Sequence, residues 1–321
     1  MDTNIQVSII CCAYNQENYI EDALKGFVMQ KTDFNYEVLI SDDASTDRTP
    51  EIIREYEKKY PDIIKPVYLT ENVYSTGKYP GEILMKKAQG KYFALCEGDD
   101  YWISDHKLQR QYDALEKHPE CDMSAHGALK VRPDDCSTIG TVEPMKEDGI
   151  LTMEKVIDGG GDFIATNSLF FRRKLAENPP DYLKFTGIDY AYQMCGAARG
   201  GIVYLSEIMS AYRRGAQNSW TVKFMKSKRE VMIGHLDKMM KMLDMANEET
   251  QHKFEKDFVF AKSKYEFQKA TLQRDVKTVY GRKFASFRKQ MSAKRKLILG
   301  LQCFAPWSIS VYHRIKSARN K

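Results

Sequence analysis

The sequence lacks the features that mark exported and membrane-spanning proteins. Its seven cysteines are an odd set without a Cys-x-x-Cys pair, which favours buried thiols in a reducing compartment over a disulfide framework. No uninterrupted apolar run reaches the roughly 18 residues that a membrane-spanning helix needs, and Met1 to Asn4 do not resemble the start of a secretory signal. We therefore expect a cytoplasmic protein, and attachment to the inner face of the cell membrane stays open.

Several cofactor-binding and nucleotide-binding patterns are missing as well. The six histidines show no metal-ligand spacing, so we expect no zinc site. The phosphate-binding pattern Gly-x4-Gly-Lys-Ser/Thr is absent, and Gly159 to Gly161 lack the strand and helix of a dinucleotide loop. With 43% hydrophobic and 29% charged residues, the 321-residue chain has a globular composition and room for one large α/β domain or two smaller domains.

Acidic residues are missing from the end of the chain. None follows Asp275, whereas twelve lysines and arginines lie between Lys277 and Lys321. The first 275 residues carry 37 basic and 44 acidic side chains. The sequence therefore predicts an acidic body followed by a basic tail, which we place at residues 282–321.

The first two thirds of the chain alternate short apolar runs with helical periodicity. Strands are predicted at 7–13, 36–41, 63–69, 91–96, 121–131, 163–172 and 202–205. Helices are predicted at 20–28, 49–60, 81–89, 105–118 and 188–199. The second helix is expected to have Thr49 as its N-cap and Pro50 as its first residue. This alternation predicts an α/β fold with a Rossmann-like, mostly parallel central sheet flanked by helices.

Polar clusters follow three of the predicted strands, at Tyr14 to Glu17, Asp42 to Asp47 and Glu97 to Trp102. In a mostly parallel sheet such segments lie at the edge where ligands bind. Carboxylates gathered there repel one another unless a cation or hydrogen-bond donors neutralise them, and carboxylate oxygens suit Mg²⁺ or Mn²⁺. Each cluster alone is also ordinary turn chemistry, but three clusters on one edge favour a ligand site.

The order of these motifs resembles that of family 2 glycosyltransferases. Val7 to Ile10 leading into Ala13-Tyr14-Asn15, and then Glu37 to Asp47, are similar to the start of that family. Gly90-Lys91-Tyr92 leading to Glu97-Gly98-Asp99-Asp100 resembles the family's Asp-x-Asp segment, and the resemblance covers roughly residues 5–215. It implies the GT-A fold and an inverting transfer of a sugar from a nucleotide-diphosphate donor to a hydroxyl of a glycan or lipid-linked acceptor.

The resemblance also implies roles for individual residues. Asp99 would ligate the Mn²⁺ or Mg²⁺ that bridges the donor diphosphate, and Glu97 takes the first position of the Asp-x-Asp segment, with direct coordination by its longer side chain left open. Asp43 would contact the base, and Trp102 could stack on a sugar face. The nucleotide-sugar-binding residues implied in this way are Tyr14, Asn15, Glu17, Asp42, Asp43, Asp99, Asp100, Trp102 and Arg213.

The family's catalytic base is an acidic residue late in the domain, at the start of a helix, and Asp189 in Thr186-Gly187-Ile188-Asp189-Tyr190 matches that place. Inverting transfer needs a carboxylate to deprotonate the acceptor hydroxyl, and a helix N-terminus favours the ionised form. Asp189 is therefore the predicted base, and the alternative is a carboxylate that only stabilises the helix dipole. Asp181 is the nearest competitor, but it follows Pro179-Pro180 and is expected in a surface turn. Arg213 or Arg214 would clamp the diphosphate, or both would form a solvated basic pair.

From about Trp220 the pattern is helical only. We expect a GT-A catalytic domain over residues 1–218 and a helical extension over residues 219–281, followed by the basic tail. A helix-packing seam, for the same chain or for a homodimer, is formed by Phe254, Phe258, Ala261, Tyr265, Gln268 and Leu272. In the tail, one apolar face among basic residues would hold Phe284, Phe287, Met291, Ile298 and Leu301. Such a face suits an anionic membrane surface or packing on the body, and no nucleic-acid-binding module accompanies it.

Two other functions are weighed against the metal-assisted glycosyltransferase. A nucleotidyltransferase on a similar fold would need a glycine-rich, basic phosphate loop after the first strand, where this chain has Tyr14 to Glu17. A non-catalytic scaffold or nucleotide-sugar-binding protein need show no metal-coupled binding of a nucleoside diphosphate. The motifs favour the enzyme, and the usual setting for such family members is a bacterial cell-surface polysaccharide pathway.

Overall fold

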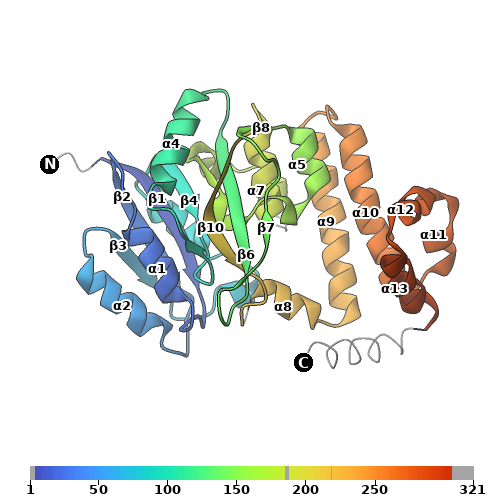
Figure 1. Ribbon diagram of the computed structural model, residues 1–321, viewed down its shortest axis with the longest axis horizontal. Helices are drawn as coiled ribbons and strands as arrows, with labels where there is room; N and C mark the ends of the chain where they lie inside the picture. Colours follow the sequence, from blue (N-terminus) through green and yellow to red (C-terminus); the bar gives the residue numbers. More distant parts are fainter. Residues whose placement is uncertain (1–3, 185–187, 218, 306–321) are drawn as a thin grey trace. The chain divides into compact units, whose positions relative to one another are not determined.

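The computed structural model describes residues 4–184, 188–217 and 219–305. The chain divides into two compact units, Met1–Lys226 and Ser227–Lys321. The first unit is a mixed α/β structure and the second is helical in its described part (Figure 1). Within the described ranges, no helix is long and apolar enough to cross a membrane.

The N-terminal unit is built around one mixed sheet. Its strands are β1 (Ile5–Ala13), β2 (Asn35–Asp42), β3 (Ile64–Tyr68), β4 (Tyr92–Leu95), β5 (Tyr101–Trp102), β6 (Met123–Val131), β7 (Thr138–Val142), β8 (Gly149–Leu151), β9 (Phe170–Arg172) and β10 (Ile202–Arg213). The order is β3-β2-β1-β4-β9-β6-β10-β5, with β7 paired to β6 and β8 to β10. The four strands β1 to β4 are parallel, β9 is antiparallel to β4 and β6, and β6 and β10 are parallel.

Helices and short turns connect these strands (Figure 1). The α-helices of this unit are α1 (Ile20–Val28), α2 (Thr49–Lys59), α3 (Gly81–Lys87), α4 (Lys107–Lys117), α5 (Met153–Gly159), α6 (Lys174–Glu177), α7 (Ile188–Ala197) and α8 (Trp220–Met225). The 3₁₀ turns are η1 (Tyr74–Thr76), η2 (Gly161–Phe163), η3 (Thr166–Ser168) and η4 (Asp181–Lys184).

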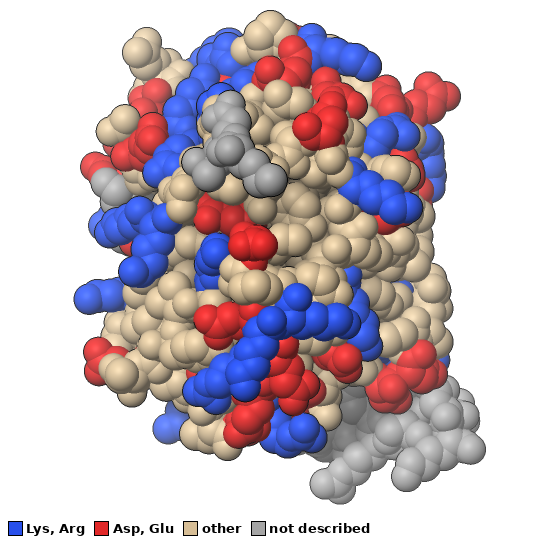
Figure 2. Space-filling view, turned by 90° about the vertical axis from the view of Figure 1, so that its left-hand side faces the viewer, with Lys and Arg blue, Asp and Glu red and all other residues tan. Residues whose placement is uncertain are grey.

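On the face that carries α2 and β3, acidic and basic side chains are interspersed (Figure 2).

The apolar patterns of the N-terminal segment are confirmed. Strand β1 is buried along most of its length, with Val7 and Ile9 fully enclosed, as expected for a central strand covered on both faces. Helix α1 buries Ile20, Leu24 and Phe27 against this core and leaves its acidic residues outside. The C-terminal ends of β1, β2 and β4 therefore carry the three polar clusters at one edge of the sheet.

Two local predictions are wrong. Thr49 does not cap α2, because it already belongs to the helix and its hydroxyl accepts a hydrogen bond from the backbone N–H of Gln16 at 2.8 Å. The strand predicted at 163–172 is much shorter, since only β9 (Phe170–Arg172) pairs in the sheet. The preceding polar residues form η3, whose buried side chains and carbonyls make hydrogen bonds that a ladder would not supply.

The C-terminal unit is helical throughout its described part. It contains α9 (Arg229–Glu249), α10 (Glu255–Gln273), α11 (Val276–Tyr280), η5 (Arg282–Phe284), α12 (Ala285–Gln290) and α13 (Ala293–Phe304). Helices α9 and α10 pack on each other. The predicted seam is confirmed in its first half, where Phe258 and Ala261 are buried. In its second half Phe267 and Ala270 are buried instead, because Phe267 turns toward Phe284 and packs on it at 5.2 Å between ring centroids.

The described part of the basic tail packs within this same unit. Phe284, Leu299 and Cys303 join Phe267 and Ala270 in one hydrophobic cluster. Of the apolar face predicted for the tail, Phe284 is therefore buried, and two further members lie against the cluster, namely Phe287 and Met291. The other side of α13 is open, since Leu297 is 58% exposed and Phe304 is 65% exposed.

Candidate active site

The loops that follow β1 and β2 are hydrogen-bonded to each other. The backbone N–H of Asn15 donates to the hydroxyl of Ser45 (2.9 Å), and Asn15 Oδ1 accepts from the N–H of Thr46 (2.8 Å). Asn15 adopts a left-handed backbone with φ of 51°, which asparagine tolerates better than most residues. Glu17 donates its N–H to the carboxylate of Asp47 at 3.1 Å. The structure thus brings the first two polar clusters together, and Asn15 and Glu17 hold the loops to each other.

Asp42 is the last residue of β2, Asp43 follows it, and both are buried. The two carboxylate oxygens of Asp43 accept hydrogen bonds from the backbone N–H groups of Val73 (2.7 Å) and Tyr74 (3.0 Å). Asp43 therefore fixes the loop that contains η1, and its expected contact with a nucleobase stays a prediction. Burial raises the pKa of Asp42, and hydrogen bonds with Ser45 oppose that rise.

Helix α8 approaches the same edge, which the sequence did not reveal. Tyr14, the residue after β1, is half-buried, and the ammonium nitrogen of Lys223 lies 5.3 Å from the centre of its ring. On the other side of the helix, Thr221 forms a side-chain hydrogen bond with Tyr212 near the end of β10. Tyr14 thus lies at the edge of the sheet that carries the polar clusters, next to α8.

Three carboxylates from two distant segments lie next to these loops, Glu97 and Asp99 after β4 and Asp189 in α7. Burial raises the pKa of Glu97 to about 8, and the nearby charges of Asp99 and Asp189 add to that rise. The hydroxyl of Tyr79 donates a hydrogen bond to Glu97 Oε1 at 3.2 Å. Burial also raises the pKa of Asp99, and the Arg213 guanidinium opposes this. The Asp-x-Asp segment and the residue predicted as the base therefore lie within electrostatic reach of each other.

Asp189 lies in the first turn of α7, as predicted from the sequence, and the structure shows it exposed. Desolvation by the surrounding protein raises its pKa, and the charge of Asp162 adds to this. A side-chain hydrogen bond with Thr166 lowers the pKa and favours the ionised form. The arrangement gives one carboxylate that is open to solvent and held by a hydroxyl donor, which is what a base acting on an incoming hydroxyl needs. The flanking residues Thr186 and Gly187 lie outside the described residues.

Trp102 has a different position from the one expected. It is only 2% exposed and packs edge-to-face on Phe27 of α1, with ring centroids 5.0 Å apart. Its indole N–H donates to the carbonyl oxygen of Asn167 at 2.9 Å. A ring enclosed in this way cannot stack on a sugar, because α1 covers it. Asp100 is buried as well, and its carboxylate accepts from the N–H of Arg213 (2.8 Å) and from Asn167 Nδ2 (3.0 Å).

Arg213 is likewise part of the protein interior. It is 2% exposed, donates to the carbonyl oxygen of Asp99 at 2.9 Å and forms an ion pair with Asp22. The rings of Tyr101 and Tyr19 flank its guanidinium at 4.4 and 5.2 Å. This placement does not agree with a guanidinium held ready for a diphosphate. Of the two arginines predicted to clamp the diphosphate, Arg214 is exposed and Arg213 is not.

Gly98, between Glu97 and Asp99, packs closely against side chains of the β1 loop and of α1. A Cβ at this position would lie 2.3 Å from Gln16 Oε1 and 2.7 Å from Ile20 Cδ1. The Gly98 N–H donates to the carbonyl oxygen of Cys12 at 3.0 Å, which joins the segment to the end of β1. The glycine therefore lets the Glu97–Asp99 segment lie directly against the first loop.

Sequence reasoning assigned no role to two residues that touch carboxylates of the Glu97–Asp100 segment. Tyr79 stands in Tyr79-Pro80-Gly81, where a Cβ on Gly81 would come within 2.3 Å of the tyrosine ring, so the glycine was a local sign that this ring folds back. Asn167 lies in a polar run inside an otherwise apolar segment, and that run was the sign of a buried polar turn.

The carboxylates suit a hard divalent cation. Within the described ranges, no group of three or more His, Cys, Asp or Glu side chains is arranged to hold a metal ion. Glu97 and Asp99 offer carboxylate oxygens only, and Mg²⁺ is usually held by one or two carboxylates together with substrate phosphates. The two carboxylates therefore fit a metal that binds with a phosphate-bearing ligand and do not form a complete protein cage.

Comparison with known proteins agrees with this geometry. The family model described as Glycosyl transferase family 2 matches residues 8–177, which is more than half of the chain. The chain belongs to glycosyltransferase family 2.

Two relatives show how far the similarity extends. An uncharacterised protein of Mycobacterium tuberculosis is 37% identical over 218 residues, which cover 67% of this chain and 60% of that relative. A poly(ribitol-phosphate) beta-glucosyltransferase of Bacillus spizizenii is 34% identical over 130 residues, which cover 39% of this chain and 19% of the relative. The chain spans about three-fifths of the length of the first curated relatives that it matches.

Two solved structures share the fold. TarS residues 1–349 of Staphylococcus aureus, in complex with UDP-GlcNAc, match with a TM-score of 0.59 and 16% identity over 93% of this chain and 78% of that chain. A mannosyltransferase of Pyrobaculum calidifontis, in complex with GDP-Man and Mn²⁺, matches with a TM-score of 0.51 and 16% identity over 94% and 85%. The predicted GT-A fold with helices at the C-terminal end is thereby confirmed.

Proposed function

We propose that this protein transfers a sugar, with inversion, from a nucleotide-diphosphate donor to a hydroxyl of a glycan or lipid-linked acceptor. The observation that carries the proposal is that Asp189 of α7 lies within electrostatic reach of the Glu97–Asp99 segment, which follows β4. Two fold neighbours were solved with sugar nucleotides, UDP-GlcNAc in one and GDP-Man in the other. These complexes support a nucleotide-sugar donor.

Asp189 is the proposed catalytic base. Its carboxylate takes the proton from the acceptor hydroxyl while the hydroxyl oxygen forms a bond to the anomeric carbon, and the bond from that carbon to the diphosphate breaks with the electron pair leaving on the phosphate oxygen. Attack opposite the leaving group inverts the anomeric configuration. The exposure of Asp189 and its hydrogen bond with Thr166 support this role.

The donor side of the site is proposed at Asp99 and Glu97. These residues would hold Mn²⁺ or Mg²⁺ together with the donor diphosphate, and such an ion supplies charge neutralisation for the departing phosphate. Tyr14 is proposed to line the nucleotide pocket, and Arg214, the exposed neighbour of the buried Arg213, is proposed to contact the diphosphate. The loop residues Asn15, Glu17, Asp42 and Asp43 are proposed to shape that pocket.

A bacterial cell-surface polysaccharide pathway is the proposed setting. The Bacillus spizizenii relative is named as acting on poly(ribitol-phosphate), which supports an anionic polymer as the acceptor. We further propose that the basic tail contacts an anionic membrane surface. The open side of α13, with Leu297, Phe304 and the exposed Lys294 and Lys296, supports this contact.

The decisive test is release of nucleoside diphosphate from a panel of sugar nucleotides, with and without Mn²⁺. Asp189→Asn should lower kcat by about 10²- to 10⁴-fold, the contribution typical of a general base. Asp99→Asn should raise the Mn²⁺ concentration needed for activity. Asp181→Asn is the matched control, because Asp181 is an exposed acidic residue in η4, near Asp189 in sequence, and it should leave turnover unchanged. Full turnover by Asp189→Asn would remove its assignment, and retention of the donor's anomeric configuration would exclude single displacement.

A further inference from the structure

Asn167 lies at the centre of η3 and is completely buried. Every polar atom of its side chain has a partner. Its Nδ2 donates to Asp100 Oδ2 and to the carbonyl oxygen of Ala211, each at 3.0 Å, and its Oδ1 accepts from the hydroxyl of Ser210 at 2.7 Å. One amide thus ties the carboxylate of Asp100 to strand β10.

The η3 turn is itself fixed by a second buried group. The indole of Trp102 donates to the carbonyl oxygen of Asn167, and Gln111 Nε2 donates to that of Ser168 at 2.8 Å. Lys107 is completely buried and links both of these side chains, because its Nζ donates to Gln111 Oε1 at 2.7 Å and lies 3.9 Å from the centre of the Trp102 ring. Buried polar networks whose members are all satisfied hold one geometry.

We propose that Asn167 is a positioning residue for the donor side of the site, and this inference rests on the proposed function. Asp100 follows Asp99 directly, and its two carboxylate oxygens are held by Asn167 and by the Arg213 N–H. Both partners are donors, so a residue 167 that cannot donate leaves Asp100 Oδ2 without this hydrogen bond. Asn167 therefore fixes the backbone of the Glu97–Asp100 segment and, through it, the direction in which Asp99 presents its carboxylate.

The informative variant is Asn167→Asp, which keeps the shape and places a carboxylate opposite Asp100. Gln30 provides a matched control. Its buried amide lies just beyond the C-terminal end of α1, whereas the Glu97–Asp99 segment lies against the N-terminal end of that helix. Gln30 Nε2 donates to two carbonyl oxygens, those of Gly26 (3.0 Å) and Ser104 (2.8 Å), and Gln30 Oε1 accepts from the N–H of Leu108 (3.1 Å). Gln30→Glu therefore makes the same chemical change in an equally bonded amide that does not touch Asp100.

Each variant should be compared at a temperature where thermal unfolding shows it to be folded. The readouts are Mn²⁺ binding to the full-length chain, measured by electron paramagnetic resonance with the metal alone, and the donor KM. Asn167→Asp should weaken Mn²⁺ binding and raise the donor KM at least tenfold, whereas Gln30→Glu should stay within twofold of wild type even where both lose similar stability. Adding Asp100→Asn to Asn167→Asp should recover part of the loss, because the new amide can donate to the new carboxylate.

The outcomes separate the two proposals. If the wild type neither binds Mn²⁺ nor releases nucleoside diphosphate, the proposed function fails and the role of Asn167 falls with it. If the wild type is active and Asn167→Asp matches Gln30→Glu in Mn²⁺ binding and donor KM, only the positioning role is overturned. If Asn167→Asp lowers kcat alone, with both affinities unchanged, the residue does not act on the donor side and the inference is wrong.

Discussion

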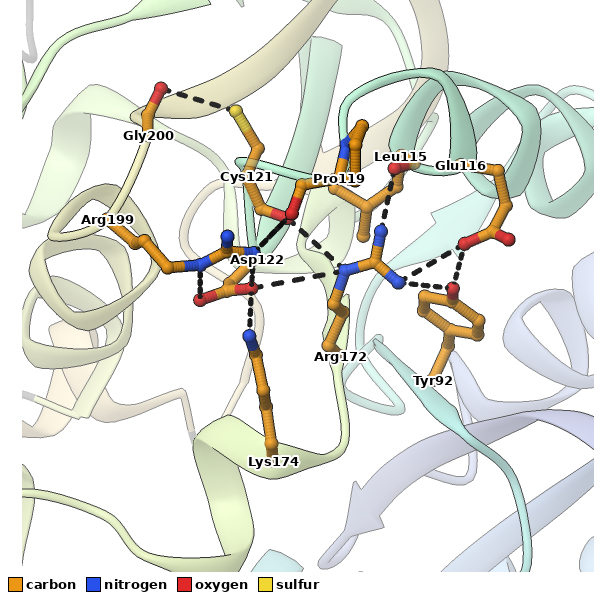
Figure 3. A network of polar contacts seen from close by, with 10 residues as sticks. All are labelled: Tyr92, Leu115, Glu116, Pro119, Cys121, Asp122, Arg172, Lys174, Arg199 and Gly200. Atoms are coloured by element: carbon orange, nitrogen blue, oxygen red, sulfur yellow. Dashed lines mark hydrogen bonds and ion pairs between the residues drawn. The ribbon is translucent and has the colours of Figure 1, made fainter.

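The guanidinium of Arg199 donates two hydrogen bonds to the carboxylate of Asp122, from Nε to Oδ2 at 2.9 Å and from Nη2 to Oδ1 at 2.6 Å. Lys174 adds an ion pair to Oδ1 at 2.7 Å, and Arg172 lies 3.9 Å away from the same oxygen (Figure 3). Asp122 stands just before β6, whereas Arg199 follows the C-terminal end of α7. This contact therefore anchors the helix whose first turn carries Asp189.

Replacing this carboxylate should cost stability in a pH-dependent way. Burial alone would raise the pKa of Asp122, but hydrogen bonds with Arg199 and Lys174 outweigh it and lower the pKa. Asp122→Asn should lower the free energy of unfolding by about 2 kcal/mol at neutral pH, the scale of a hydrogen bond to a charged group. A lowered native pKa stabilises the protein above the unfolded-state pKa of about 3.9 and ceases to do so as the pH falls through the native value.

Urea unfolding of both proteins between pH 7 and pH 3 measures this effect, and the difference should shrink below about pH 4. Asp113→Asn is the control, because Asp113 is exposed and accepts from Gln109 within the same helix at 2.9 Å. A difference between wild type and Asp122→Asn that stays constant over this range would contradict the assigned ion pairs.

Gly98→Ala tests whether the Glu97–Asp99 segment must lie against the first loop. The added methyl group would meet Gln16 Oε1 at 2.3 Å and Ile20 Cδ1 at 2.7 Å. Both atoms are the ends of flexible side chains that can shift, so we expect a loss at the lower end of the range for overpacked sites, about 1 kcal/mol in unfolding free energy. Nucleoside diphosphate release should fall by more than the unfolded fraction explains. Gly161→Ala is the matched control, since its nearest contact would be an ordinary 3.7 Å to Tyr190 Cβ. Equal behaviour of the two variants would refute the packing requirement.

The fold could be predicted because its signals are local. A strand buried on both faces must be apolar throughout, as Val7 to Ala13 are, and a helix on its surface needs a stripe such as the one in α1. The three polar clusters were assigned to one edge because all of them follow strands of the predicted parallel sheet. Their role as a donor site came from the family resemblance and not from periodicity.

The positions of Trp102 and Arg213 could not be predicted in the same way. An aromatic residue beside an acidic motif is expected at the surface, but α1 packs directly on β5, where a Cβ on Gly26 would lie 3.0 Å from the Trp102 backbone. The guanidinium of Arg213 is buried because Asp22, which pairs with it, and a tyrosine ring come from α1 and the turn before it, far away in the sequence. Because the residues that bury Trp102 and Arg213 are distant in the sequence, the local sequence around them shows no pattern that predicts their burial.

Thr166→Val should change the pH dependence of turnover. The hydrogen bond between Thr166 and Asp189 lowers the pKa of the carboxyl group, so its loss leaves desolvation and Asp162 to raise that pKa further. A base must be ionised to act, and activity therefore falls as the pH drops through this pKa. The acidic limb of the kcat/KM profile should move to higher pH in Thr166→Val and stay in place in Thr166→Ser, which keeps the hydroxyl. An unshifted limb in Thr166→Val would separate Thr166 from the base.

The tail should bind anionic membranes through the open side of α13. Leu297, Leu301 and Phe304 follow one another at the i, i+4, i+7 spacing of a single helix face, opposite the buried Leu299 and Cys303. Such an apolar strip flanked by lysines suits the boundary of an anionic bilayer. We expect co-sedimentation with phosphatidylglycerol vesicles but not with neutral phosphatidylcholine vesicles, and weaker binding at higher salt.

Surface variants test this contact better than deletion of residues 282–321, because deletion would also remove Phe284 and Leu299 from the cluster that covers Phe267. Leu297→Ser combined with Phe304→Ser should abolish most of the binding. Lys294→Glu and Lys296→Glu should each weaken it at least fivefold, since a basic residue near an anionic surface contributes about 1 kcal/mol. Val259→Ser removes an equally exposed apolar side chain from α10 and should leave sedimentation unchanged. If Val259→Ser weakens binding as much as the α13 variants do, the membrane contact is not specific to α13. If the α13 variants sediment like wild type, any membrane contact lies elsewhere in the chain.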